Sequence, residues 1–124
     1  MTPSLILAGA RVVDSRGLVA EQADILIEGD TIVGVGKQSR PPEADVIDVT
    51  GMTICPGLMN AHVHICFDCS VDPEASFAAE SEIETALAAL PRLTETLDRG
   101  VTTIRDLGGK ENVTLALAQA TAEG

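Results

Sequence analysis

The chain has 124 residues, of which 45% are hydrophobic and 2% are aromatic, with no Trp or Tyr. Its 8 basic and 19 acidic residues give a formal charge of −11, which repels phosphate backbones and anionic membrane surfaces and so argues against nucleic acid and membrane partners. No apolar run approaches the ~18 residues of a membrane span, and the start lacks the basic region of a signal peptide. We therefore expect a cytoplasmic protein.

The length and hydrophobic content suit one ordinary domain with its own core. Because Val, Ile, Leu and Ala must supply that core, the composition favours an α/β or α+β protein. The three cysteines, an odd number in a chain without an export signal, are expected to be free thiols.

The first part of the chain is predicted to be almost entirely β. Gly9 separates two short apolar runs and is expected to mark a bulge or a bend. Gly29-Asp30 is predicted to form the two-residue type II′ turn of a hairpin. The predicted strands cover residues 4–8, 10–14, 24–28, 31–35, 46–49 and 52–55.

The second part is predicted to alternate strands and helices, an α/β pattern. We expect a strand over 58–65, a helix near 76–89, a second helix beginning at Pro91 and ending at Gly100, a strand over 101–106 and a helix over 112–122. A βαβα order predicts two parallel strands joined by a right-handed crossover.

The only two histidines, His62 and His64, are separated by one residue in the predicted strand over 58–65. Alternating side chains point to opposite faces of a strand, so the two imidazoles share a face, roughly 6.5 to 7 Å apart along the chain. Such a pair can bind one metal ion, since neutral imidazole is a common ligand. Taken alone, the spacing is a weak signal and favours two histidines engaged in ordinary hydrogen bonds over a metal site.

The residues around the pair carry a resemblance to a known family. The run Pro56-Gly57-Leu58-Met59-Asn60-Ala61-His62-Val63-His64 closely resembles the Pro-Gly-apolar-apolar-Asp/Asn-x-His-x-His motif of the amidohydrolase superfamily, with Asn60 where Asp is commoner. Residues 100–109 resemble the second-strand segment of its imidazolonepropionase-like and Xaa-Pro dipeptidase-like branch. The hairpin at 29–32 resembles the family's amino-terminal sandwich strands.

The resemblance implies a β-sandwich part over 1–55 and, over 56–124, the first two βα units of a TIM (β/α)8 barrel. It also implies that His62 and His64 bind a divalent metal, expected to be zinc. In the family, water activated by the metal attacks an amide, peptide or cyclic amide C–N bond, so the expected partner is a small-molecule or peptide-like amide substrate. No catalytic residue is assigned in this chain.

A complete barrel typically takes about 250 residues, and the family's remaining ligands, a carboxylated lysine, two histidines and an aspartate, come from later strands. This sequence has no third histidine, and its lysines, Lys37 and Lys110, do not match the bridging position. We therefore expect an amino-terminal fragment, inactive alone, that associates with the missing carboxyl-terminal barrel portion or with itself.

Two alternatives remain open. Cys66 and Cys69 lie beside the histidines in a Cys-x-x-Cys spacing, which could form a small structural zinc module, and the chain could instead be a non-catalytic remnant. Four further residues could contribute to the site or could serve as ion-pair, loop or turn residues: Arg105, Asp106, Asp68 and Asp72.

Overall fold

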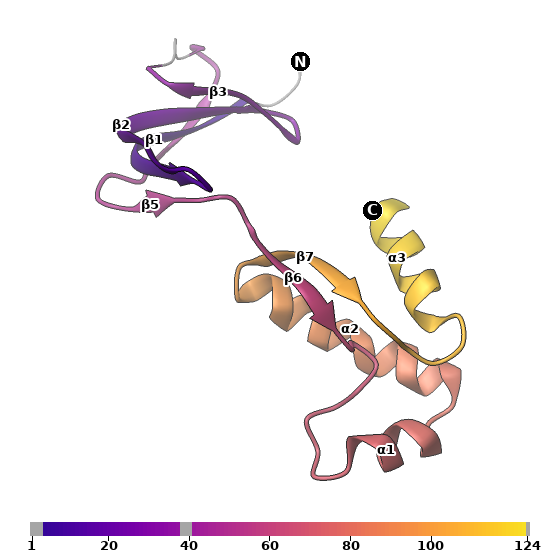
Figure 1. The fold of residues 1–124 in the computed structure, drawn as a ribbon. Helices are drawn as coiled ribbons and strands as arrows, with labels where there is room; N and C mark the ends of the chain where they lie inside the picture. The colour runs from indigo at the N-terminus through magenta and orange to yellow at the C-terminus, as the bar shows by residue number, and fades with distance from the viewer. Residues whose placement is uncertain (1–3, 38–40, 124) are drawn as a thin grey trace. The chain divides into compact units, whose positions relative to one another are not determined.

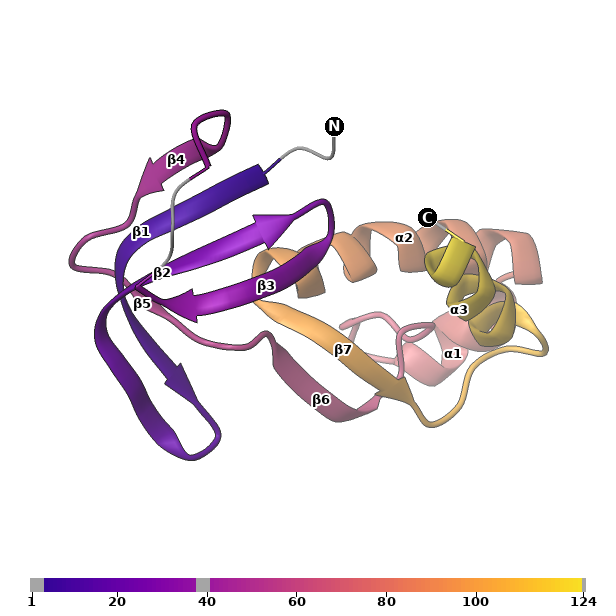
Figure 2. The ribbon, with the colours of Figure 1, turned by 90° about the horizontal axis from the view of Figure 1, so that it is seen from above.

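The computed structural model describes residues 4–37 and 41–123. The chain divides into two compact units, Met1–Pro56 and Gly57–Gly124. The first unit is one sheet with strands in the order β3-β2-β1-β4, and β5 also pairs with β1 (Figures 1 and 2). Its strands are β1 Ser4–Asp14, β2 Gly17–Glu28, β3 Thr31–Gly36, β4 Asp45–Asp48 and β5 Thr53–Ile54.

The two runs predicted on either side of Gly9 belong to one strand, β1, interrupted by the predicted bulge. Gly9 has φ of +79°, and the pairing of β1 with β2 shifts between Leu7 and Ala10. A Cβ at Gly9 would lie 2.5 Å from Thr50 Oγ1, so both its conformation and its surroundings favour glycine. Residues before the bulge pair with β4 and residues after it pair with β5.

The hairpin at Gly29-Asp30 is confirmed: it connects β2 to β3, with Glu28 paired to Thr31 and φ of +62° at Gly29. The predicted length of β2 was wrong, because this strand begins at Gly17 and not at Asp24. Its first half pairs with the end of β1, for example Ala20 with Val12. Both faces are polar or exposed there, which leaves no alternating pattern to read in the sequence.

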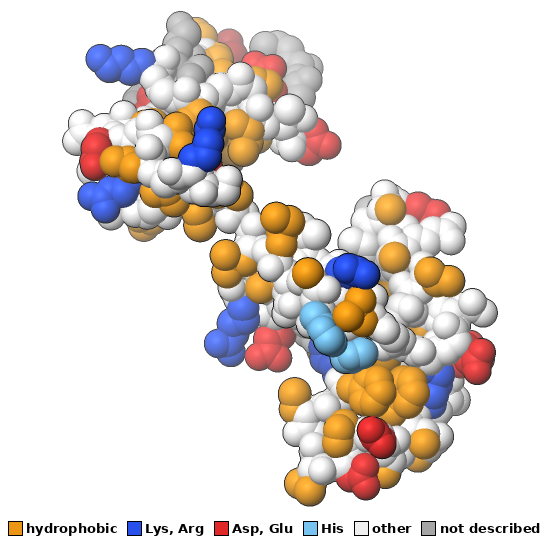
Figure 3. Space-filling model, in the orientation of Figure 1, with side chains coloured by type: hydrophobic (Ala, Val, Ile, Leu, Met, Phe, Trp, Pro, Cys, Tyr) orange, Lys and Arg blue, Asp and Glu red, His pale blue; other side chains and the backbone are white. Residues whose placement is uncertain are grey.

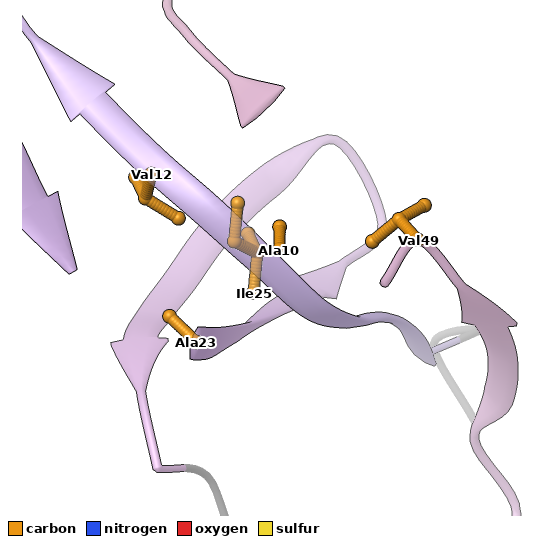
Figure 4. Packing of buried hydrophobic residues seen from close by; sticks show 5 residues of the cluster. All are labelled: Ala10, Val12, Ala23, Ile25 and Val49. Atoms are coloured by element: carbon orange, nitrogen blue, oxygen red, sulfur yellow. The ribbon is translucent and has the colours of Figure 1, made fainter. Parts of the chain in front are cut away.

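The core of the first unit consists of small and aliphatic side chains from facing strands. Alternate residues of β1 and β2 point to one side, and Val49 packs with them after β4 (Figure 4). The cluster contains Ala10, Val12, Ala23, Ile25 and Val49.

The second unit has two parallel strands, β6 and β7, connected through two helices, as the βαβα pattern predicts. In Figures 1 and 2 the two strands run side by side; α2 lies near β7, and α3 lies near α2. The elements are β6 Leu58–Val63, α1 Pro73–Ala79, α2 Glu82–Asp98, β7 Val101–Asp106 and α3 Val113–Glu123. The predicted strand over 58–65 was too long at its end, so His64 follows β6 instead of lying within it.

The predicted helix boundary at Pro91 was wrong, because α2 runs through this proline. The break falls at Ser81, where a reciprocal capping box with Glu84 satisfies the first backbone donors of α2. Pro91 cannot donate to the carbonyl of Leu87, but Leu87 is 63% exposed and water can replace that donor. The end of α2 is as predicted: Gly100 has φ of +82° and donates to the Leu97 carbonyl at 2.8 Å.

The second unit leaves much apolar surface uncovered. Its buried side chains are Cys66, Thr85, Ala89 and Val113. A groove of about 520 Å³ lies over β7 between α2 and α3. The large hydrophobic residues exposed in this unit are Leu58, Met59, Val71, Ile83, Leu87, Leu90, Leu97, Leu107 and Leu115. Within the described ranges, no helix has the length and apolar character needed to cross a membrane.

Candidate metal centre

The structure brings the two histidine rings together. His62 lies in β6 and His64 directly after it, and their ring centroids are 5.4 Å apart with the planes at 71°. Both residues are exposed. Figure 3 shows the two side chains in contact on the surface, bordered by hydrophobic groups. The pair is therefore accessible to an ion from solvent.

One hydrogen bond determines which nitrogen of His64 is available. His64 Nδ1 lies 3.1 Å from the carbonyl oxygen of Gly108, in the loop after β7. A carbonyl can only accept, so Nδ1 must carry the hydrogen. In the neutral ring the lone pair is then on Nε2. An imidazole that binds a metal while its other nitrogen donates to a carbonyl has this same tautomer.

Asp106, at the end of β7, holds the backbone around His64. Its Oδ2 accepts from the N–H of Ile65 at 2.8 Å, and its Oδ1 accepts from the N–H of Gly108 at 2.9 Å. Arg92 of α2 donates to the carbonyl of Ile65 at 3.1 Å. Both Asp106 oxygens thus bind backbone donors, and the carboxylate connects the loops that follow β6 and β7.

His62 is oriented through its backbone. Its N–H donates to Asn60 Oδ1 at 3.1 Å. An aspartate would offer the same acceptor oxygen at this position, so the Asn in place of the commoner Asp preserves this contact.

The two loop aspartates have local structural roles. Asp68 accepts from the hydroxyl of Ser70 at 2.6 Å and from its N–H at 3.1 Å, and these hydrogen bonds lower the pKa of the Asp68 carboxyl. Asp72 is the N-cap of α1 and accepts from the N–H of Ala75 at 3.0 Å. Arg105 is exposed near the end of β7.

The cysteines are free thiols, as expected. Cys66 is buried at 2% exposure, whereas Cys69 is exposed. Within residues 4–37 and 41–123, no three or more His, Cys, Asp or Glu side chains are grouped so that they could hold a metal ion. The structure thus assembles the histidine pair and does not add the two thiols to it.

Three residues near the pair were missed by sequence reasoning. The ring of Phe67 packs against His64 with centroids 5.6 Å apart and planes at 74°, and Phe77 of α1 stacks on Phe67 at 4.4 Å and 7°. Lys110 Nζ lies 4.8 Å from the Phe77 ring centroid. A signal existed in the sequence, since the only two phenylalanines follow His64 by 3 and 13 positions.

The chain thus has a β-rich unit followed by a unit of parallel strands and helices. The histidine pair lies at the end of the first of these parallel strands. The amidohydrolase family model matches residues 53–124. The chain belongs to the amidohydrolase family, which confirms the resemblance seen in residues 56–64 and 100–109.

Comparison with solved structures and curated relatives agrees. A prolidase solved with N-methylphosphonate-L-proline superposes with a TM-score of 0.82 at 34% identity, over 98% of this chain and 29% of that one. A dihydroorotase from Syntrophotalea carbinolica is 32% identical over 103 residues, 80% of this chain and 24% of that protein. A dihydroorotase from Streptococcus thermophilus is 38% identical over 60 residues, 48% of this chain and 14% of that protein. The chain therefore spans less than a third of each relative. The structural match and the family model confirm the predicted fold class and the dipeptidase-like branch.

Proposed function

We propose that this chain is the amino-terminal part of a metal-dependent amidohydrolase and that His62 and His64 bind its divalent metal, with zinc as the preferred ion. The proposed enzyme hydrolyses an amide, peptide or cyclic amide C–N bond. The observation that carries the proposal is the His64 Nδ1 contact to the Gly108 carbonyl, which leaves Nε2 of a paired, exposed imidazole free to bind a metal.

The two histidines are the type of ligand that zinc prefers, but they are too few for a complete zinc site. Imidazole nitrogen suits zinc, but a catalytic zinc normally takes three protein ligands, and the described residues contribute a histidine pair. Once bound, such an ion lowers the pKa of water and polarises a carbonyl oxygen. The residues of this chain orient the ligands. Gly108 fixes the tautomer of His64, Asp106 holds the backbone of Ile65 directly after it, and Asn60 holds the backbone of His62.

The relatives support the proposed class of substrate. Solved and curated relatives are named prolidase and dihydroorotase, names that support a peptide-like or cyclic amide bond. The acidic surface of the chain, with a formal charge of −11, is unfavourable for a polyanionic substrate.

Metal binding tests the assignment of the ligands. Zn²⁺ titrated into the purified chain should bind, and either His62→Ala or His64→Ala should weaken binding by about tenfold or more, since each removes one ligand. Cys69→Ser is the matched control because Cys69 is exposed in the same loop region and should not change the affinity. A loss with Cys69→Ser and none with the histidine variants would instead support the zinc module. Absence of binding in any preparation would support a non-catalytic remnant.

We also propose that the second unit associates with further barrel strands or with another copy of itself. Met59 and Leu58 of β6 are 79% and 58% exposed, and β6 and β7 form a sheet of two strands within the described residues. Unpaired strand edges beside apolar side chains favour association. Size-exclusion chromatography of the chain should show oligomers, and a stable monomer would contradict this proposal.

A further inference from the structure

All four aromatic rings of the sequence, two Phe and two His, lie in one continuous series of ring contacts. His62 contacts His64 at 5.4 Å, His64 contacts Phe67 at 5.6 Å, and Phe67 contacts Phe77 at 4.4 Å between centroids. We call Phe77, Phe67, His64 and His62 the ring series. The series begins in α1 and ends at the proposed metal ligands.

Phe67 restricts the ring of His64. The two planes meet at 74°, an edge-to-face geometry that aromatic rings prefer. His64 is exposed and lies beyond the last residue of β6, so strand pairing does not fix its side chain. Its ring is restricted instead by the Gly108 carbonyl, by His62 and by Phe67.

Phe67 is in turn held by α1. Phe77 stacks on it nearly parallel, at 7°. α1 has seven residues and none is buried, so packing into a core does not hold this helix. Lys110 does so: its ammonium donates to the carbonyl oxygens of Phe77 and Glu80 at the end of α1 and lies over the Phe77 ring.

Both ends of this arrangement therefore return to one short segment after β7. Gly108 accepts from His64, and Lys110, two residues later, anchors α1 and Phe77. Residues 108–110 thus act on His64 in two ways. Gly108 contacts His64 directly, and Lys110 holds α1, whose Phe77 stacks on the Phe67 ring that packs against His64.

We propose that Phe67 is a positioning residue that holds His64 in its Nδ1-protonated, metal-ready orientation, and that Lys110 supports it by anchoring α1 through Phe77. The inference rests on the proposed function for its purpose, but its geometry can be tested without metal. It also gives the loop that carries Phe67 a role beyond connecting β6 to the helices.

The test compares the His64 ring nitrogens by ¹⁵N NMR in the metal-free full chain at mildly alkaline pH. In the unmodified chain His64 should be mainly the Nδ1-protonated tautomer. Phe67→Leu should give a mixture of tautomers and weaken Zn²⁺ binding by about tenfold, the lower end of the effect of removing a group that orients a ligand. Phe67→Tyr keeps the ring and should restore both properties.

Lys110→Met provides an independent variant, since it keeps most of the side-chain length and removes the ammonium. It should change the His64 tautomer ratio in the same direction as Phe67→Leu, whereas the matched control Lys37→Met, an exposed lysine in the other unit, should not. If Phe67→Leu fails to fold, Lys110→Met decides the question. An unchanged tautomer ratio in a folded Phe67→Leu or Lys110→Met chain would overturn the inference. If the unmodified chain binds no Zn²⁺, the proposed function fails, and the tautomer comparison still tests the role of Phe67.

Discussion

Asp106 Oδ2 accepts a hydrogen bond from the backbone N–H of Ile65 at 2.8 Å. This contact joins the end of β7 to the residue that follows His64, across 41 positions of sequence. Its second oxygen is also occupied, by the N–H of Gly108. The carboxylate therefore acts as a structural connection between the two strand ends, beside the proposed ligand and separate from it.

Asp106→Asn should destabilise the second unit by about 1–3 kcal/mol, the cost of leaving a partly buried donor unpaired. An amide has one acceptor oxygen and one donor nitrogen, so it cannot accept from both Ile65 and Gly108. Urea unfolding and amide hydrogen exchange at these two residues should detect the change. Asp98→Asn, the same substitution at an exposed site of α2, should stay within about 0.5 kcal/mol of the unmodified chain. Equal stability of the two variants would refute the connection.

Gly109→Ala and Gly108→Ala should differ sharply although the residues are adjacent. A Cβ at Gly109 would lie 2.3 Å from Thr114 Cγ2 and 2.9 Å from Cys66 Sγ, whereas at Gly108 the nearest atoms are those of the His64 ring, at 3.8 Å and beyond. Overpacking should cost Gly109→Ala about 1–3 kcal/mol of unfolding free energy, and Gly108→Ala should be tolerated. Adding Thr114→Ser to Gly109→Ala removes the closest methyl group and should recover part of the loss. Similar stabilities for the two alanine variants would show that Thr114 and Cys66 readily move aside.

The capping box of α2 should make stability depend on pH. The backbone N–H of Ser81, followed by its hydroxyl, lowers the pKa of the Glu84 carboxyl below its ordinary value of 4.5. The charged form is therefore favoured in the folded chain, and its contribution is present above the ordinary pKa and is lost as pH falls through the lowered one. Glu84→Gln should be less stable than the unmodified chain at neutral pH, and the difference should close on acidification.

Unfolding curves recorded from neutral to acidic pH measure this effect. Ser81→Ala should cost about 1 kcal/mol at neutral pH through loss of the N-cap. A constant difference between Glu84→Gln and the unmodified chain at every pH would show that the charge of Glu84 does not matter.

Much of the fold could be predicted from local signals. The turn at Gly29-Asp30, the end of α2 at Gly100 and the bulge at Gly9 each depend on a glycine whose requirement is local. The pairing of 17–22 with the end of β1 depends on a long-range partner and leaves no periodic pattern. Proline usually interrupts a helix, yet α2 continues through Pro91. Its continuation depends on a capping box ten residues earlier and on solvent access at Leu87.

The candidate site shows the same division. The spacing of His62 and His64 predicts that their rings share one side of the chain, and the two rings do lie together, although His64 follows the last residue of β6. The partners of His64 come from Gly108, 44 positions away, and from a loop whose path no sequence pattern specifies. The contact of Lys110 with α1 likewise spans 33 positions to Phe77. Such contacts are determined by tertiary structure and lie beyond the reach of local propensity.

The ring series also determines how the molecule can be observed. With no Trp or Tyr in the sequence, the chain has almost no near-ultraviolet absorbance and no useful intrinsic fluorescence. Its aromatic proton NMR spectrum, in contrast, contains signals from four rings only, and all four lie between α1 and the end of β6. An unlabelled sample therefore gives a spectrum in which every aromatic signal reports on the surroundings of the proposed metal ligands.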